Sequence, residues 1–149
     1  MENIDGNVIL SHEDVAGERI SVYLVTGIKV DTLNKWSELV LEEIKNHSDE
    51  QSFLALFDLS TRGVSLIYSI WSKKSFLNIA ITEHGHDKLE IILNDKSMFK
   101  AKVAYLFSDT HSGNISQLFG RIAQRRENNI HIQYDIFSDK SEALDWLTS

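Results

Sequence analysis

The middle of the chain contains the stretch Phe53-Leu54-Ala55-Leu56-Phe57-Asp58-Leu59. Except for Asp58, its residues are apolar at odd and even positions alike, which is typical of a strand buried on both faces in the middle of a sheet. A second stretch, Ala101–Phe107, repeats the pattern with Val103-Ala104-Tyr105-Leu106-Phe107. The two stretches predict central strands covered by helices, and therefore an α/β fold.

The residues before these strands predict a hairpin and a helix. Val8–Ser11 and Arg19–Thr26 are strand candidates that a polar stretch with Gly17 separates, which is typical of a hairpin. Asp31 is the expected N-cap of the helix, and Asn46–Asp49 is expected to end it. Apolar residues at helical spacing form the inner face of this helix: Leu33, Trp36, Val40 and Ile44.

The residues after Phe107 predict a helix, a strand and a final helix. An apolar stripe indicates a helix between Ser112 and Glu127. From Ile130 to Ile136 apolar and polar residues alternate, so this strand exposes one face and is expected at an edge of the sheet. A strand, a helix and a strand in this order predict a right-handed crossover with parallel strands. Asp139 and Glu142 form a capping-box pattern at the start of the last helix, whose docking residues are Ala143, Leu144, Trp146 and Leu147.

The segment from Gly63 to Lys100 combines helical spacing with many β-branched and aromatic residues, so its sequence does not decide between helix and strand. One helix start is expected there at Asp87, with Leu89, Ile92 and Leu93 facing inward. The three tryptophans all fall on apolar stripes, and we expect them in the core: Trp36, Trp71 and Trp146.

Composition excludes several functional classes. The 149 residues contain no repeat or linker, so we expect a single domain over residues 1–149. The absence of cysteine excludes disulfides, Cys-ligated zinc and a thiol nucleophile. The net charge of −7 arises from residues 1–50, which hold 11 acidic and 4 basic residues, and this argues against nucleic-acid binding. The longest apolar runs have five residues, too few to span a membrane, and the acidic N-terminal residues do not resemble a signal peptide. We therefore expect a cytoplasmic protein.

Two stretches resemble a known family. Asp58-Leu59-Ser60, which closes the buried strand, is similar to the matching strand of STAS domains, the fold of anti-sigma-factor antagonists. The segment Phe137–Leu147 resembles the end of the bacterial STAS-like proteins called SpoIIAA-like, and the strand from Lys102 to Tyr105 also suits them. The resemblance covers roughly residues 53–149. It implies a mixed sheet covered by helices and a regulatory role without enzymatic activity, through a protein partner or self-association as a homodimer. Phosphorylated antagonists carry an Asp-Ser-Ser-Gly type motif after this strand, whereas here the sequence is Ser60-Thr61-Arg62-Gly63-Val64-Ser65.

Two loops are predicted to meet at the carboxyl ends of the central strands, where α/β proteins commonly bind ligands. The candidate ligand or switch residues in these loops are Asp58, Ser60, Thr61, Arg62, Ser65, Asp109, His111 and Ser112. Helix N-termini favour anions, so a phosphate would be stabilised there, either on a ligand or covalently on Ser60, Thr61 or Ser65. The alternative is that these residues only cap helices.

Three further clusters of charged or polar residues each allow more than one interpretation. The residues Glu83-His84-Gly85-His86-Asp87 suit zinc or nickel but are also typical of a solvated loop. Asp58 and Asp109 would be paired carboxylates if their strands were adjacent, although no nucleophile motif accompanies them. Arg121, Arg125 and Arg126 form a basic cluster that suits either solvent or an acidic partner.

The sequence therefore predicts a regulatory or protein-interaction domain without a metal or another cofactor. The alternative is a domain that binds a small anionic or lipid ligand in the crevice beyond the central strands. A hydrolase ranks third, because the chain has no Gly-x-Ser-x-Gly motif.

Overall fold

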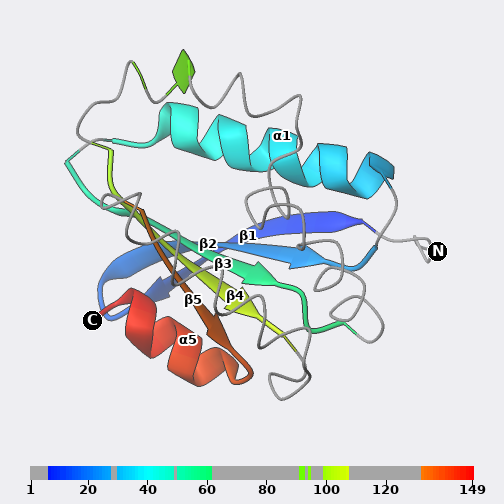
Figure 1. The fold of residues 1–149 in the computed structure, drawn as a ribbon. Helices are drawn as coiled ribbons and strands as arrows, with labels where there is room; N and C mark the ends of the chain where they lie inside the picture. Colours follow the sequence, from blue (N-terminus) through cyan, green and yellow to red (C-terminus); the bar gives the residue numbers. More distant parts are fainter. Residues whose placement is uncertain are drawn as a thin grey trace.

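The described residues of the computed structural model contain five strands in one mixed sheet, with α1 on one face and α5 on the other (Figure 1). The structure describes residues 7–27, 30–48, 50–61, 91–92, 94, 99–107 and 132–149. The strands and helices of these residues are β1 (Val8–Val15), β2 (Glu18–Val25), α1 (Val30–Asn46), β3 (Phe53–Asp58), β4 (Ala101–Leu106), β5 (Ile132–Phe137) and α5 (Lys140–Leu147). Within these ranges, no helix combines the length and the apolar character that a membrane span requires.

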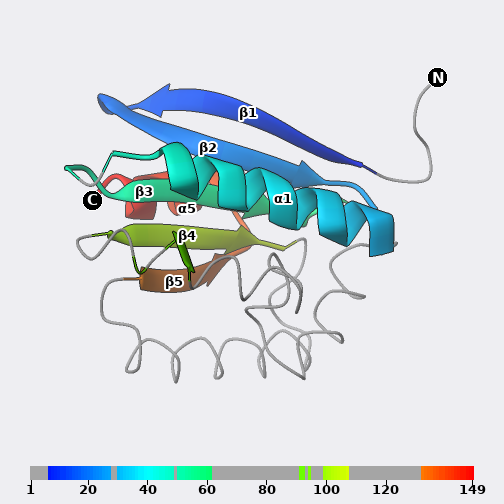
Figure 2. The ribbon, with the colours of Figure 1, turned by 90° about the horizontal axis from the view of Figure 1, so that it is seen from above.

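The strand order is β1-β2-β3-β4-β5, so strands that follow one another among the described elements also lie side by side (Figure 2). β1 is antiparallel to β2, and the other neighbouring pairs are parallel. This order confirms the predicted hairpin, the central position of β3 and the edge position of β5. The parallel pairing of β4 with β5 is also as expected, and the helix predicted at Ser112–Glu127 lies outside the described residues.

β3 is buried on both faces, as its sequence predicts. Its side chains alternate between two apolar clusters, and each residue from Phe53 to Phe57 is at most 5% exposed. Phe57 faces α1 and makes edge-on contacts with three other rings, whose centroids lie 5.1 to 5.4 Å away: Tyr23, Trp36 and Tyr105. Leu54 and Leu56 face α5 instead, where they pack with Ala143 and Leu147. The sheet therefore has two separate cores that share β3.

The predicted first helix is confirmed except at its start. Trp36, Val40 and Ile44 are buried against the sheet, and the helix ends at Asn46. The N-cap prediction for Asp31 is wrong, because α1 already includes Val30. Asp31 lies in the first turn, where its negative charge favours the positive end of the helix dipole.

The hairpin is tighter than predicted. β1 continues to Val15, and only Ala16 and Gly17 connect it to β2. The predicted loop was too long because Glu13 and Asp14 are polar, yet an edge strand exposes one side to solvent and accepts such residues. Both turn residues have positive φ angles, 53° for Ala16 and 83° for Gly17, which is typical of the type I′ turns that join twisted strands.

α5 docks as predicted, although its cap differs in detail. Asp139 occupies the N-cap position but makes no side-chain capping hydrogen bond. Ala143 and Leu147 are buried, whereas Trp146 is half-buried and packs against Phe137, with ring centroids 5.6 Å apart. The core prediction therefore holds fully for Trp36, which is 0% exposed, and partly for Trp146.

The predictions for residues 63–100 lie mostly outside the described part of the chain. Trp71, Asp87, Leu89 and Leu93 are among the residues without a description. Ile91, Ile92 and Asn94 are helical, and Ile92 packs against the core on the α1 side. This agrees with the inward position that the sequence predicts for Ile92.

The hairpin turn provides a test of this geometry. A positive φ angle disfavours alanine by about 1–2 kcal/mol, and Asn-Gly is the preferred pair in a type I′ turn. We expect Ala16→Asn to raise the free energy of unfolding by about 0.5–1 kcal/mol, measured by urea denaturation. Gly17→Ala should lower it by about 1 kcal/mol, although a Cβ at Gly17 would meet no atom within 4 Å. A stabilising Gly17→Ala would contradict the assigned turn.

Candidate functional site

The turn at the carboxyl end of β3 is held by Asp58. Its Oδ1 accepts hydrogen bonds from the backbone N–H of Ser60 at 3.0 Å and from the Ser60 hydroxyl at 2.5 Å. The N–H of Leu59 donates to the carbonyl of Leu106 at 2.8 Å, which fastens the turn to β4. Asp58 lies opposite Leu24 of β2 and Leu106 of β4. Because these leucines are apolar, the half-buried carboxylate is directed toward the turn by its hydrogen bonds.

The structure describes three of the eight candidate site residues that the sequence predicts. Asp58 and Ser60 are in contact, and the half-buried Thr61 follows them directly. β3 and β4 are adjacent and parallel, as the predicted crevice requires. The remaining five candidates lie outside the described residues: Arg62, Ser65, Asp109, His111 and Ser112.

Two other predicted clusters also lie outside the described residues. These are the metal candidate Glu83–Asp87 and the basic cluster Arg121, Arg125 and Arg126. Where the chain is described, no group of three or more His, Asp or Glu residues could hold a metal ion. The same limit applies to the carboxylate pair, because Asp58 is described and Asp109 is not.

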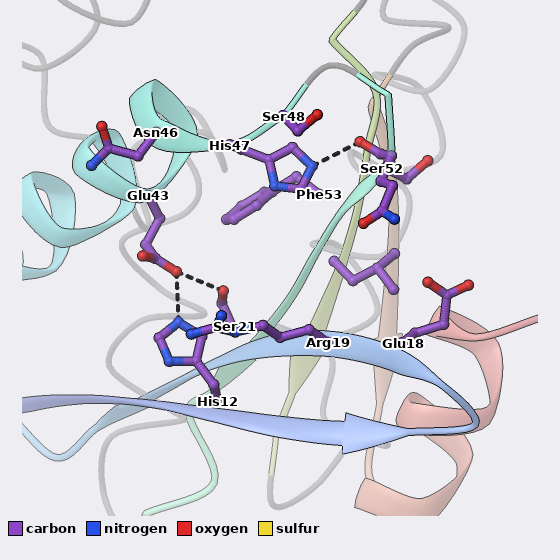
Figure 3. A pocket seen from close by; sticks show the side chains of 12 residues that line it. His12, Glu18, Arg19, Ser21, Glu43, Asn46, His47, Ser48, Ser52 and Phe53 are labelled. Carbon is purple, nitrogen blue, oxygen red and sulfur yellow. Dashed lines mark hydrogen bonds and ion pairs between the residues drawn. The ribbon is translucent and has the colours of Figure 1, made fainter.

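A pocket that the sequence analysis missed lies at the opposite end of the sheet (Figure 3). It has a volume of about 240 Å³ and is formed by the start of β2, the start of β3 and the C-terminal end of α1. Its lining is polar except for Phe53 and Leu54. The pocket and the Asp58 turn are therefore separated by the length of β3.

Glu43 forms the centre of the polar network in this pocket. Its Oε1 accepts hydrogen bonds from His12 Nε2 at 2.9 Å and from the Ser21 hydroxyl at 2.8 Å. His12 and Ser21 lie opposite each other in β1 and β2, and Glu43 reaches them from α1, as Figure 3 shows. One carboxylate oxygen thus connects three elements, and Ser21 is a buried polar residue with a satisfied hydroxyl.

The charges around Glu43 favour its ionised form. Partial burial by itself raises the pKa of Glu43, but hydrogen bonds from His12 and Ser21, the charge of His12 when its ring is protonated, and the positive charge of Arg19 outweigh this effect. The pKa is therefore lower than its ordinary value of 4.5. Arg19 acts at a distance, since it forms no ion pair with Glu43.

His47 shapes the rim of the pocket just after α1. Its Nε2 donates a hydrogen bond to the carbonyl of Gln51 at 2.7 Å, and its ring packs edge-on against Phe53 with the centroids 5.4 Å apart. The loop between α1 and β3 is thereby folded back over the start of β3. This arrangement leaves Ser48 and Ser52 beside the pocket.

The sequence carries little signal for this pocket. His12 lies between the two predicted hairpin strands, and Glu43 is not among the apolar residues that predict the inner face of the first helix. Their meeting depends on the register that places His12 opposite Ser21. A longer β1 in the prediction would have placed His12 on the same face as Val8 and Leu10, which is the face that α1 covers.

The comparisons with known proteins identify the fold. No family model and no curated protein matches the chain. Among solved structures, an uncharacterised DUF3478 family protein with a SpoIIAA-like fold, from Shewanella loihica, matches over 99% of this chain and 98% of its own. The two chains are 20% identical, and the TM-score is 0.50. The chain therefore has a SpoIIAA-like fold, as the sequence resemblance implies.

The network around Glu43 predicts a pH-dependent contribution to stability. A carboxyl group whose pKa is lower in the folded state stabilises the fold above its unfolded pKa and loses this effect as the pH falls through its folded pKa. We expect Glu43→Gln to lower the free energy of unfolding by about 1 kcal/mol near pH 7. The difference from the wild type should shrink as the pH falls below 4.5. Urea denaturation over a series of pH values measures this difference in the free energy of unfolding.

The matched control is Glu42→Gln, which replaces an exposed carboxylate on the same helix. Its effect on stability should stay small at every pH. If the Glu43→Gln difference grew as the pH fell below 4.5, the hydrogen-bonded carboxylate would not be the stabilising form.

Proposed function

We propose that this protein is a regulatory domain without enzymatic activity, which binds a protein partner or a second copy of itself. The observation that carries the proposal is the SpoIIAA-like fold over 99% of the chain, with a hydroxyl-bearing turn at the carboxyl end of β3. We propose that a change at this turn, which contains Asp58 and Ser60, controls whether the partner binds. The proposal requires no metal or other cofactor.

The contact between Asp58 and Ser60 supports a switch that works by charge. The Ser60 hydroxyl donates to a carboxylate oxygen at 2.5 Å. A phosphate on Ser60 would replace this donor with an anion, and like charges at such a distance repel. The turn would then have to open, so a modification of one atom would change the surface at the end of β3.

The neighbouring candidates complete the proposed site. Thr61 and Ser65 are further hydroxyls that a phosphate could modify, and Arg62 and His111 would pair with the added charge. Asp109 and Ser112 follow β4 in the sequence, and in this proposal they would share the same surface. The alternative proposal is that this edge of the sheet binds a small anionic or lipid ligand.

Mass spectrometry on protein purified from its own host tests the switch. We expect a phosphate-sized mass that survives denaturation and maps to Ser60, Thr61 or Ser65. A mass present in native spray and lost on denaturation would instead support a carried ligand. An unmodified protein with nothing bound would contradict both proposals for this edge of the sheet.

Binding by charge variants provides the second test. We expect Ser60→Asp and Ser60→Ala to differ by about tenfold in affinity for the same partner or for a second copy, a difference of about 1.4 kcal/mol. Quantitative pull-downs and light scattering measure the two cases. Ser141→Asp, at an exposed position of α5, is the matched control and should behave as the wild type. Equal binding by both Ser60 variants would remove this turn from the function.

A further inference from the structure

The pocket between α1, β2 and β3 presents charges of opposite sign, and we propose that it binds a small zwitterionic molecule of the amino-acid class. It lies at the amino ends of β2 and β3, whereas the proposed switch lies at the carboxyl end of β3. Figure 1 shows the two ends of these strands. The inference is therefore independent of the proposed function.

Glu43 provides the negative side of the pocket. Both of its hydrogen bonds from His12 and Ser21 go to Oε1, and they fix the orientation of the carboxylate. Oε2 accepts no hydrogen bond from any described residue. The nearby C-terminal end of α1 adds partial negative charge. An ammonium group carries three donors and one positive charge, and it is the complement of such a surface.

Arg19 provides the positive side. Its guanidinium forms no hydrogen bond or ion pair with the residues that the structure describes, although its charge acts on Glu43. A guanidinium matches the two oxygens of a carboxylate in a forked geometry. Arg19 and Glu43 thus line one pocket without pairing with each other. A ligand that carries both an ammonium and a carboxylate group can bridge them.

The size and lining of the pocket limit the ligand further. The pocket volume of about 240 Å³ leaves room for a ligand of the size of an amino acid. Ser48, Ser52 and Asn46 add hydroxyl and amide groups for hydrogen bonds to polar atoms. Phe53 and Leu54 are the apolar part of the lining and can contact a short side chain.

Nuclear magnetic resonance titration of the full ¹⁵N-labelled chain tests the proposal. The probes are glycine, L-serine, sodium acetate, methylammonium chloride and inorganic phosphate, at constant pH and ionic strength. We expect glycine and L-serine to shift the amide signals of Ser21, Asn46 and Ser52 until saturation. The affinity for acetate and for methylammonium should be lower by a factor of about ten or more, since each lacks one of the two charges.

Variants identify the two charged groups. Arg19→Gln and Glu43→Gln should each weaken binding of the amino acid by about tenfold or more, while Lys45→Gln and Glu42→Gln, at exposed positions of α1, should leave it unchanged. The amide spectrum of each variant checks that it is folded. Because the Arg19 side chain is exposed and forms no hydrogen bond or ion pair with the described residues, Arg19→Gln keeps the test valid even if Glu43→Gln is unstable.

Three results would overturn the proposal. The first is the absence of saturable shifts at the pocket with either amino acid. The second is binding of acetate or phosphate as tight as that of the amino acids, together with unchanged or tighter binding in Glu43→Gln, which would indicate a simple anion site. The third is amino-acid binding that Arg19→Gln leaves unchanged.

Discussion

The fold depends on the burial of β3 on both of its faces. Phe57 packs against the rings of Tyr23, Trp36 and Tyr105 on the α1 side, and Leu56 is fully buried on the α5 side. Burying one such side chain contributes about 1.5–3 kcal/mol, so the strand supplies a large share of the stability of both layers. α1 and α5 each cover a different set of β3 side chains. The two ends of this strand also position the two sites, the Asp58 turn and the Glu43 pocket.

Much of the fold could be predicted from the sequence because apolar patterns record burial directly. The run Phe53–Phe57 has no polar residue on either face, and this alone identifies a central strand. Edges and turns are harder to predict, as the hairpin shows. Glu13 and Asp14 are polar because β1 lies at an edge, and a pattern of polar residues does not distinguish an edge strand from a loop.

The two sites also differ in how far the sequence could predict them. Asp58 and Ser60 are two positions apart, so their contact depends on local geometry that a strand followed by a turn makes predictable. Glu43 meets His12 across 31 positions and Ser21 across 22, and these contacts depend on the sheet register and on the placement of α1. A sequence pattern contains neither quantity. The polar pocket could therefore not be predicted, because no sequence motif marks the residues that form it.

The position of α5 has a consequence for how the chain folds. Residues 132–149 contain both β5 and α5, and α5 covers Leu54 and Leu56 of β3. Lys140 reaches Glu13 at 2.9 Å across 127 positions of the chain. During synthesis the α5 side of β3 lacks this cover until the ribosome has released Leu147. Contacts of such long range slow folding and keep apolar strands exposed to aggregation while it proceeds. The synthesis of α5 thus determines when Leu54 and Leu56 gain their contacts with Ala143 and Leu147.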